Sequence, residues 1–237
     1  MEATDDPQVV LREAVALMRQ GRHAESLQKH LWFHDHALEH QLALAGVRLS
    51  FALAYWLELA ASYPEALQAL TAVRDRKARA LTDGTGSFEL FHDVAAINGY
   101  LHQEPATVAL FKRLHQMDPG LASRCYPVAE EFLVAHQEYD VCVAHLPDPV
   151  ARFEDIRGLR QVKLELAGEN PALGQSHLAD YAEVHFAEAV RRLIAILVGA
   201  GRRQEAERVR ELALATSASA TVRTALDGAL PHQNPGP

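Results

Sequence analysis

The sequence contains little cysteine and no long run of a single chemical character. Only Cys125 and Cys142 are present, and they lack CxxC spacing, so neither a disulfide framework nor a thiolate zinc site is expected. No run of about 18 apolar residues occurs, so no membrane-spanning helix is expected. The net charge is -8 and Lys and Arg are dispersed, which argues against nucleic acid as a partner.

Motifs of the common catalytic classes are also absent. The chain contains no GxSxG, P-loop, GxGxxG or HExxH sequence, each of which has a known mechanical role in catalysis or cofactor binding. Its start, M-E-A-T-D-D-P, is acidic where a signal peptide carries a basic and then an apolar region. These absences predict a cytoplasmic protein with no cofactor and no enzymatic activity of these classes.

The residues that are present favour helix throughout. Amphipathic segments of roughly 12 to 25 residues alternate with short breakers, and no segment has the alternation of a strand. The breakers are Gly21, Pro64, residues 82–87, Pro105, Pro119, residues 147–149 and Pro171. This pattern predicts an all-α fold.

Two long helices stand out. Residues 43–59 are apolar on nearly all sides apart from Arg48, Ser50 and Glu58, which predicts a single covered helix. A second long helix is expected over residues 178–198. We expect one domain over residues 1–230, followed by a disordered tail, P-H-Q-N-P-G-P, over residues 231–237.

Two stretches share one layout of apolar helix, Gly, basic residue and a second helix with small residues. They are A-V-A-L-M-R-Q-G-R-H-A-E-S-L at residues 14–27 and I-A-I-L-V-G-A-G-R-R-Q-E-A-E-R-V at residues 194–209. The layout resembles a degenerate tetratricopeptide repeat, with Gly21, Ala24 and Ser26, and then Gly201 and Ala206, at the turn and close-packing positions. The resemblance implies a right-handed α-solenoid of stacked antiparallel helix pairs. Stacking also buries the apolar face that one pair leaves open.

The run H-L-W-F-H-D-H-A-L-E-H at residues 30–40 holds four histidines. On a helix over residues 24–39, His30 and His34 fall within the apolar arc, whereas His36 and His40 lie on its flank. Two explanations stay open for the first pair. In the first explanation, both imidazoles are partly buried and hydrogen-bonded to a neighbour such as Tyr55 or Arg48. Alternatively they are metal ligands one turn apart, with a third ligand from one of His92, His136 or His145.

Three further features bear on a binding site. The triplet F-H-D occurs at residues 33–35 and again at residues 91–93; chance suffices to explain this, but equivalent helices would place both histidines on one groove. Arg48 interrupts an apolar helix, so it either forms a buried ion pair or contacts an acidic group of a ligand. R-D-R-K-A-R at residues 74–79 is a basic helix end or a partner-binding patch.

These features predict a non-enzymatic scaffold that binds a protein or peptide along a concave wall. The expected polar anchors are His34, Arg48, Tyr55, His92 and Asn98. A clamp for a peptide carboxylate is not expected, because Asn occurs only at positions 98, 170 and 234. The alternative is a metal-dependent enzyme with His30 and His34 as ligands. Self-association through an exposed apolar end of the solenoid would give a homo-oligomer.

Overall fold

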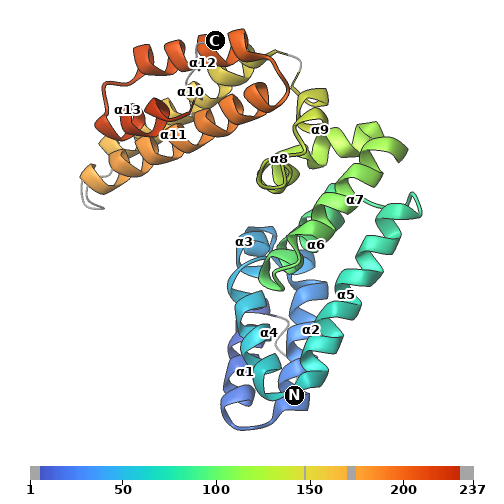
Figure 1. Cartoon of the computed structure of the whole chain (residues 1–237). Coiled ribbons are helices and arrows are strands. Elements are labelled where there is room, and N and C mark those ends of the chain that lie inside the picture. Colours follow the sequence, from blue (N-terminus) through green and yellow to red (C-terminus); the bar gives the residue numbers. More distant parts are fainter. Residues whose placement is uncertain (1–5, 147, 170–174, 230–237) are drawn as a thin grey trace. The chain divides into compact units, whose positions relative to one another are not determined.

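Figure 1 shows the computed structural model of the chain, which describes residues 6–146, 148–169 and 175–229. Every regular element in these residues is helical and none is a strand, which confirms the all-α prediction. The chain divides into two compact units, Met1–Ala129 and Glu130–Pro237. The single domain over residues 1–230 stays a prediction, and the predicted disordered tail lies outside the described residues.

The N-terminal unit is a succession of helices joined by short turns. They are α1 (Pro7–Arg19), α2 (His23–His40), the 3-10 turn η1 (Leu42–Leu44), α3 (Ala45–Arg48), α4 (Phe51–Ser62), α5 (Pro64–Thr82), α6 (Phe88–Tyr100), α7 (Glu104–Met117) and α8 (Pro119–Ala135), which ends in the second unit. Helices adjacent in the chain pack together, as α1 does on α2 and α5 on α6. This packing is compatible with a helical repeat.

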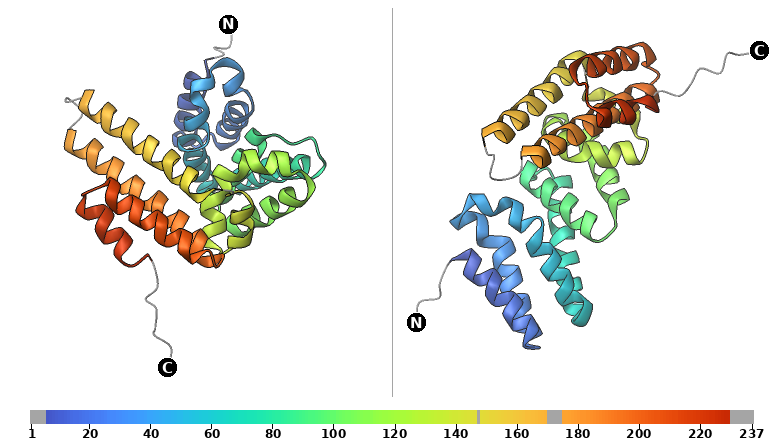
Figure 2. Two further views of the ribbon diagram at one scale, coloured as in Figure 1. Left: turned by 90° about the horizontal axis from the view of Figure 1, so that it is seen from above. Right: turned by 90° about the vertical axis from the view of Figure 1, so that its left-hand side faces the viewer.

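The C-terminal unit is built around one long helix. Its elements are α9 (Tyr139–Ala144), α10 (Pro149–Glu169), α11 (Gln175–Gly199), α12 (Arg203–Thr216) and α13 (Ala220–Asp227). Helix α11 packs against each of the other four, and Figure 2 shows it lying beside α10. It covers the helix predicted over residues 178–198. On the surface of α12, Arg203 forms an ion pair with Glu207 one turn further on, at 3.1 Å.

The two turns that carry the repeat resemblance have the same backbone. Gly21 and Gly201 both have φ near +75°, the left-handed region that favours glycine at the end of a helix. Ser26 and Ala206 are fully buried at the close-packing positions, and the Ser26 hydroxyl donates to the Ala14 carbonyl at 2.8 Å. Ala24, the other predicted close-packing residue, is exposed. The small side chain that brings α2 onto α1 is therefore Ser26.

The single helix predicted over residues 43–59 is wrong in one respect, because the segment is broken. Its two halves, Leu42–Arg48 and Phe51–Ser62, meet at a bend of 41°. At the break, the Ser50 hydroxyl donates to the Gly46 carbonyl at 2.6 Å, a contact that competes with helical hydrogen bonding. The bend leaves Arg48 buried within the N-terminal unit and Phe51 exposed.

Trp56 lies at the centre of the N-terminal core. Its ring is 1% exposed, and its indole N–H donates to the Ala66 carbonyl at 2.9 Å, which ties α4 to α5. Apolar side chains from α1, α2, α4, α5 and α6 pack with it in one cluster, which comprises Met18, Leu27, Leu53, Leu59, Ala66, Leu70, Val73 and Ile97. Burial of these apolar side chains is the main contribution to the stability of the unit.

No single helix in the described ranges is long and apolar enough to cross a membrane. The bent pair Leu42–Arg48 and Phe51–Ser62 has that length and apolar composition only when its two halves are taken together. Leu53, Trp56 and Leu59 of α4 are buried in the core of the N-terminal unit.

Candidate functional site

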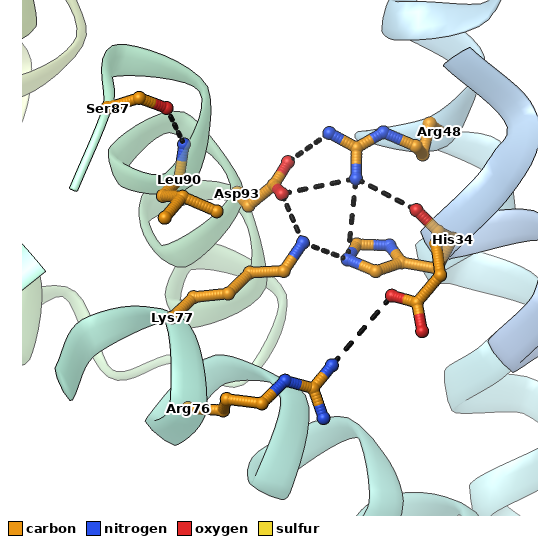
Figure 3. Close-up of polar contacts among 8 residues, drawn as sticks. His34, Arg48, Arg76, Lys77, Ser87, Leu90 and Asp93 are labelled. Carbon is orange, nitrogen blue, oxygen red and sulfur yellow. Dashed lines mark hydrogen bonds and ion pairs between the residues drawn. The ribbon is translucent and has the colours of Figure 1, made fainter. Parts of the chain in front are cut away.

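A buried polar cluster lies where α2, α3, α5 and α6 meet (Figure 3). It consists of His34, Arg48, Lys77 and Asp93, one residue from each of these helices. We call this group the polar cluster. His34, Arg48 and Asp93 are 4%, 6% and 2% exposed. Asp93 lies in α6, near the start of the helix. The Ser87 hydroxyl caps this start by accepting a hydrogen bond from the Leu90 amide.

Asp93 is the acceptor on which the cluster converges. Both terminal nitrogens of Arg48 donate to its carboxylate, Nη1 to Oδ2 at 3.1 Å and Nη2 to Oδ1. Lys77 also donates to Oδ2. A bidentate guanidinium pair of this kind fixes geometry as well as charge. The interpretation of Arg48 as half of a buried ion pair is therefore confirmed.

His34 completes the cluster as an acceptor. Its Nε2 lies 2.9 Å from Nζ of Lys77 and 3.4 Å from Nη1 of Arg48, and its backbone carbonyl accepts from Arg48 at 3.2 Å. Both neighbours are cationic donors, so Nε2 must be the unprotonated nitrogen of a neutral imidazole. The predicted contact between His34 and Arg48 is thus present.

The charges in the cluster shift one another's protonation. Burial, followed by the charges of Lys77 and Arg48, lowers the pKa of His34 to about 3. Burial also lowers the pKa of Lys77, although Asp93 opposes this. For Asp93 burial favours the protonated form, but Lys77 and Arg48 outweigh it and lower its pKa. Asp93 is thus ion-paired with both Arg48 and Lys77, and the His34 imidazole is neutral at neutral pH.

His30 is buried next to the cluster but is not part of it. Its ring stacks on Trp56 with centroids 5.8 Å apart, and it is 1% exposed. No described residue bonds to either of its ring nitrogens. Burial lowers its pKa to about 4. The predicted hydrogen bond for this histidine is therefore not found among the described residues.

Replacing His30 by Leu is expected to raise the free energy of unfolding by about 1 kcal/mol at pH 7. Leu removes two buried polar atoms that lack partners, and this gain exceeds the lost stacking on Trp56. His34→Leu is the matched control, and it should be destabilising by about 1–3 kcal/mol because Lys77 loses an acceptor. Urea denaturation measures both. Equal losses in the two variants would contradict the assignment of His30.

The alternative metal site needs a third ligand near His30 and His34. Within the described ranges, no group of three or more His, Cys, Asp or Glu side chains could hold a metal ion. The Nε2 atom of His34 also faces two cationic groups, which repel a metal ion. The geometry of the described residues therefore does not favour metal binding by His30 and His34.

The remaining predicted anchors lie in separate places. Asn98 is buried, where it accepts from Arg74 Nη1 at 2.8 Å and donates to Thr107 at 3.0 Å. His92 is half-buried against the Phe88 ring, 5.5 Å between centroids. Tyr55 is half-buried on α4. The structure brings His34 and Arg48 together but leaves these three outside the polar cluster.

The repeated F-H-D triplet has a different role in each copy. The first copy supplies His34 to the cluster, whereas the second supplies Asp93. Asp35 lies at the surface, 3.8 Å from Arg76. Lys77 and Asp93 were not predicted as site residues. Their only signals were the basic run at residues 74–79 and the second triplet, and neither signal identifies a partner.

The second feature of the unit is an apolar groove between α1 and the segment α3–α4. It has a volume of about 670 Å³ and is lined by Gln8, Leu11, Arg12, Val15, Ala16, Arg19, Phe33, Leu44, Val47, Phe51 and Tyr55. We call it the α1–α4 groove. The α1 residues recur at intervals of three and four, so one face of that helix forms a whole wall. Tyr55 is the one predicted anchor among the lining residues.

Exposed apolar surface continues around the groove. Phe51 is 64% exposed on its wall, and Leu42, just before α3, is 79% exposed. Leu11, Phe33 and Leu44 are buried and form its floor. Val47 belongs to α3, which the Arg48–Asp93 pair ties to α6. The polar cluster therefore holds one wall of the groove in place.

Comparison of the chain with protein-family models, with curated proteins and with solved structures finds no match.

Proposed function

We propose that the chain is a non-enzymatic, tetratricopeptide-like helical repeat scaffold that binds a protein or peptide in the α1–α4 groove. Support for the repeat comes from two left-handed glycine turns with buried small residues after them. Contacts between α1 and α4 and between α4 and α6 are those expected when first helices of successive pairs line one wall. We propose that these pairs stack as a right-handed solenoid of antiparallel helices.

The observation that supports this proposal most strongly is the α1–α4 groove. Isolated exposed apolar side chains are ordinary, but a concave apolar surface rimmed by polar residues is typical of a binding site. Phe51 is the largest exposed apolar side chain on it. A partner that covered Phe51 would remove its ring from water, and large buried aromatic side chains dominate the energy of many interfaces.

We propose two different roles for the predicted anchors: contact with the partner, and support of the scaffold. Tyr55 lines the groove and is proposed to contact the partner. His34, Arg48 and Asn98 each form hydrogen bonds within the chain, so we propose that they support the scaffold. His92 lies on α6 and keeps its predicted role only as a peripheral contact. Cytoplasmic location and homo-oligomer formation stay predictions.

A peptide library displayed on phage and selected on the immobilised full-length protein tests this function. We expect enriched peptides whose binding falls at least tenfold in the Phe51→Asp variant, because a carboxylate replaces an aromatic contact. Leu159→Asp is the matched control. Leu159 is 62% exposed on α10 in the C-terminal unit, so the same substitution should leave binding unchanged.

Both variants alter exposed positions, so neither should impair folding, and circular dichroism checks this. Peptides that bind equally well to the Phe51→Asp variant would overturn the groove as the site. A selection that enriches no specific peptide would overturn the proposed function.

A further inference from the structure

The α1–α4 groove has a charge opposite to that of the chain as a whole. The protein carries 31 acidic and 23 basic residues, yet the only charged residues that line the groove are Arg12 and Arg19. Both side chains are exposed. Other arginines of this unit, such as Arg22 and Arg74, bond to acidic neighbours, whereas no described residue pairs with Arg12 or Arg19. Two uncompensated cations therefore flank an apolar floor.

The two arginines lie on one face of α1 at a fixed spacing. They are seven residues apart, which is two turns or about 10 Å along the helix axis. The lining residues of α1 run from Gln8 to Arg19, or about 16 Å. A ligand that fills the groove is therefore about three helical turns long if it is itself a helix.

The chemistry of the groove favours a helical ligand over an extended one. Only four lining residues carry polar side chains, namely Gln8, Arg12, Arg19 and Tyr55. An extended peptide would bring its own amides and carbonyls against the apolar floor without partners, which is costly. A helix satisfies its backbone internally and presents apolar side chains at intervals of three and four.

We infer that the partner is an acidic amphipathic helix. Its apolar face covers Phe51 and the buried floor of the groove, and its carboxylates pair with Arg12 and Arg19. The carboxylates lie about seven residues apart on one flank of that helix, to match the spacing on α1. This inference rests on the proposed function and adds the chemical class of the partner.

The test uses three synthetic peptides of about four turns, labelled with a fluorophore and titrated with the full-length protein. The first has an apolar face and two Glu seven residues apart on its flank. The second replaces both Glu by Lys, and the third keeps the Glu but carries a central Pro, which breaks the helix. Each is titrated against wild type and against a variant with both Arg12→Glu and Arg19→Glu, and fluorescence anisotropy gives the dissociation constants.

Wild type is expected to bind the Glu peptide about tenfold more tightly than the Lys peptide, since two exposed charge pairs each contribute modestly. The preference should reverse in the double variant, and the Pro peptide should bind weakly to both proteins. Reversal distinguishes direct pairing from a general loss of structure. A preference that does not reverse would overturn the charge pairing, and equal binding of the Pro peptide would overturn the helical ligand.

Two further outcomes separate this inference from the proposed function. If none of the peptides binds but the phage selection yields ligands sensitive to Phe51→Asp, the partner class is wrong and the scaffold function stands. Anionic phosphatidylserine vesicles form a separate arm, because basic and apolar residues together also bind membranes. Retention of the protein by vesicles through Phe51, with no peptide binding, would overturn a protein partner.

Discussion

Replacement of Asp93 by Asn is expected to lower the free energy of unfolding by about 3–5 kcal/mol. The substitution keeps the shape of the side chain but removes its charge, which leaves Arg48 and Lys77 buried without a counterion. Removing one partner of a buried pair costs far more than the pair contributes, because the remaining charges stay out of water. Denaturant unfolding at neutral pH measures the loss.

The sequence supplies a matched control for this variant. Asp35 occupies the same position in the other F-H-D triplet, but it is 41% exposed and lies 3.8 Å from a largely exposed Arg76. Asp35→Asn should therefore change stability by about 0.5 kcal/mol or less. If the two variants lost equal stability, the polar cluster would not have the structural role assigned to it.

Acidification from pH 7 to pH 5 is expected to lower the free energy of unfolding by about 4 kcal/mol, about half from each buried histidine. Burial lowers the pKa of His30 to about 4, and burial with Lys77 and Arg48 lowers that of His34 to about 3. In the unfolded chain both titrate near their ordinary value of about 6.5. Below that pH the unfolded state binds protons that the folded state excludes, so stability falls as the pH decreases.

The window of this effect runs from about pH 6.5 down to the folded pKa values, below which these two groups add no further loss. Urea unfolding at pH 7, 6 and 5 measures it. His30→Leu should remove about half of the pH dependence. His40→Gln, at an exposed position, should retain it all. A stability that stays constant between pH 7 and pH 5 would contradict the burial of these neutral imidazoles.

The helices could largely be predicted from the sequence, because the apolar period and the glycine and proline breakers are local signals. Helices α2 and α11 end within a few residues of their expected limits. The break between α3 and α4 contains no proline, and the glycine near it, Gly46, lies inside α3. Arg48, the last residue of α3, contacts Asp93, 45 residues later in the chain, and a contact over that separation leaves no periodic trace.

The candidate site was predicted only in part for the same reason. Periodicity placed His30 and His34 on the apolar side of α2, and both are buried. It could not identify Lys77 or Asp93, because their roles arise from the packing of α5 and α6 against α2. The groove was missed because an amphipathic pattern shows which face of α1 is apolar, but only the tertiary packing decides which part of that face stays uncovered.

The most direct measurement for the central claim is the set of methyl chemical shifts of the full-length protein as the acidic amphipathic peptide is added. We predict the largest changes at groove methyl groups, those of Leu11, Val15, Leu44 and Val47. The exposed α10 side chains Leu159, Val162 and Leu166 serve as internal controls and should not shift. Changes confined to α10, or none in the groove at saturating peptide, would contradict the α1–α4 groove as the binding site.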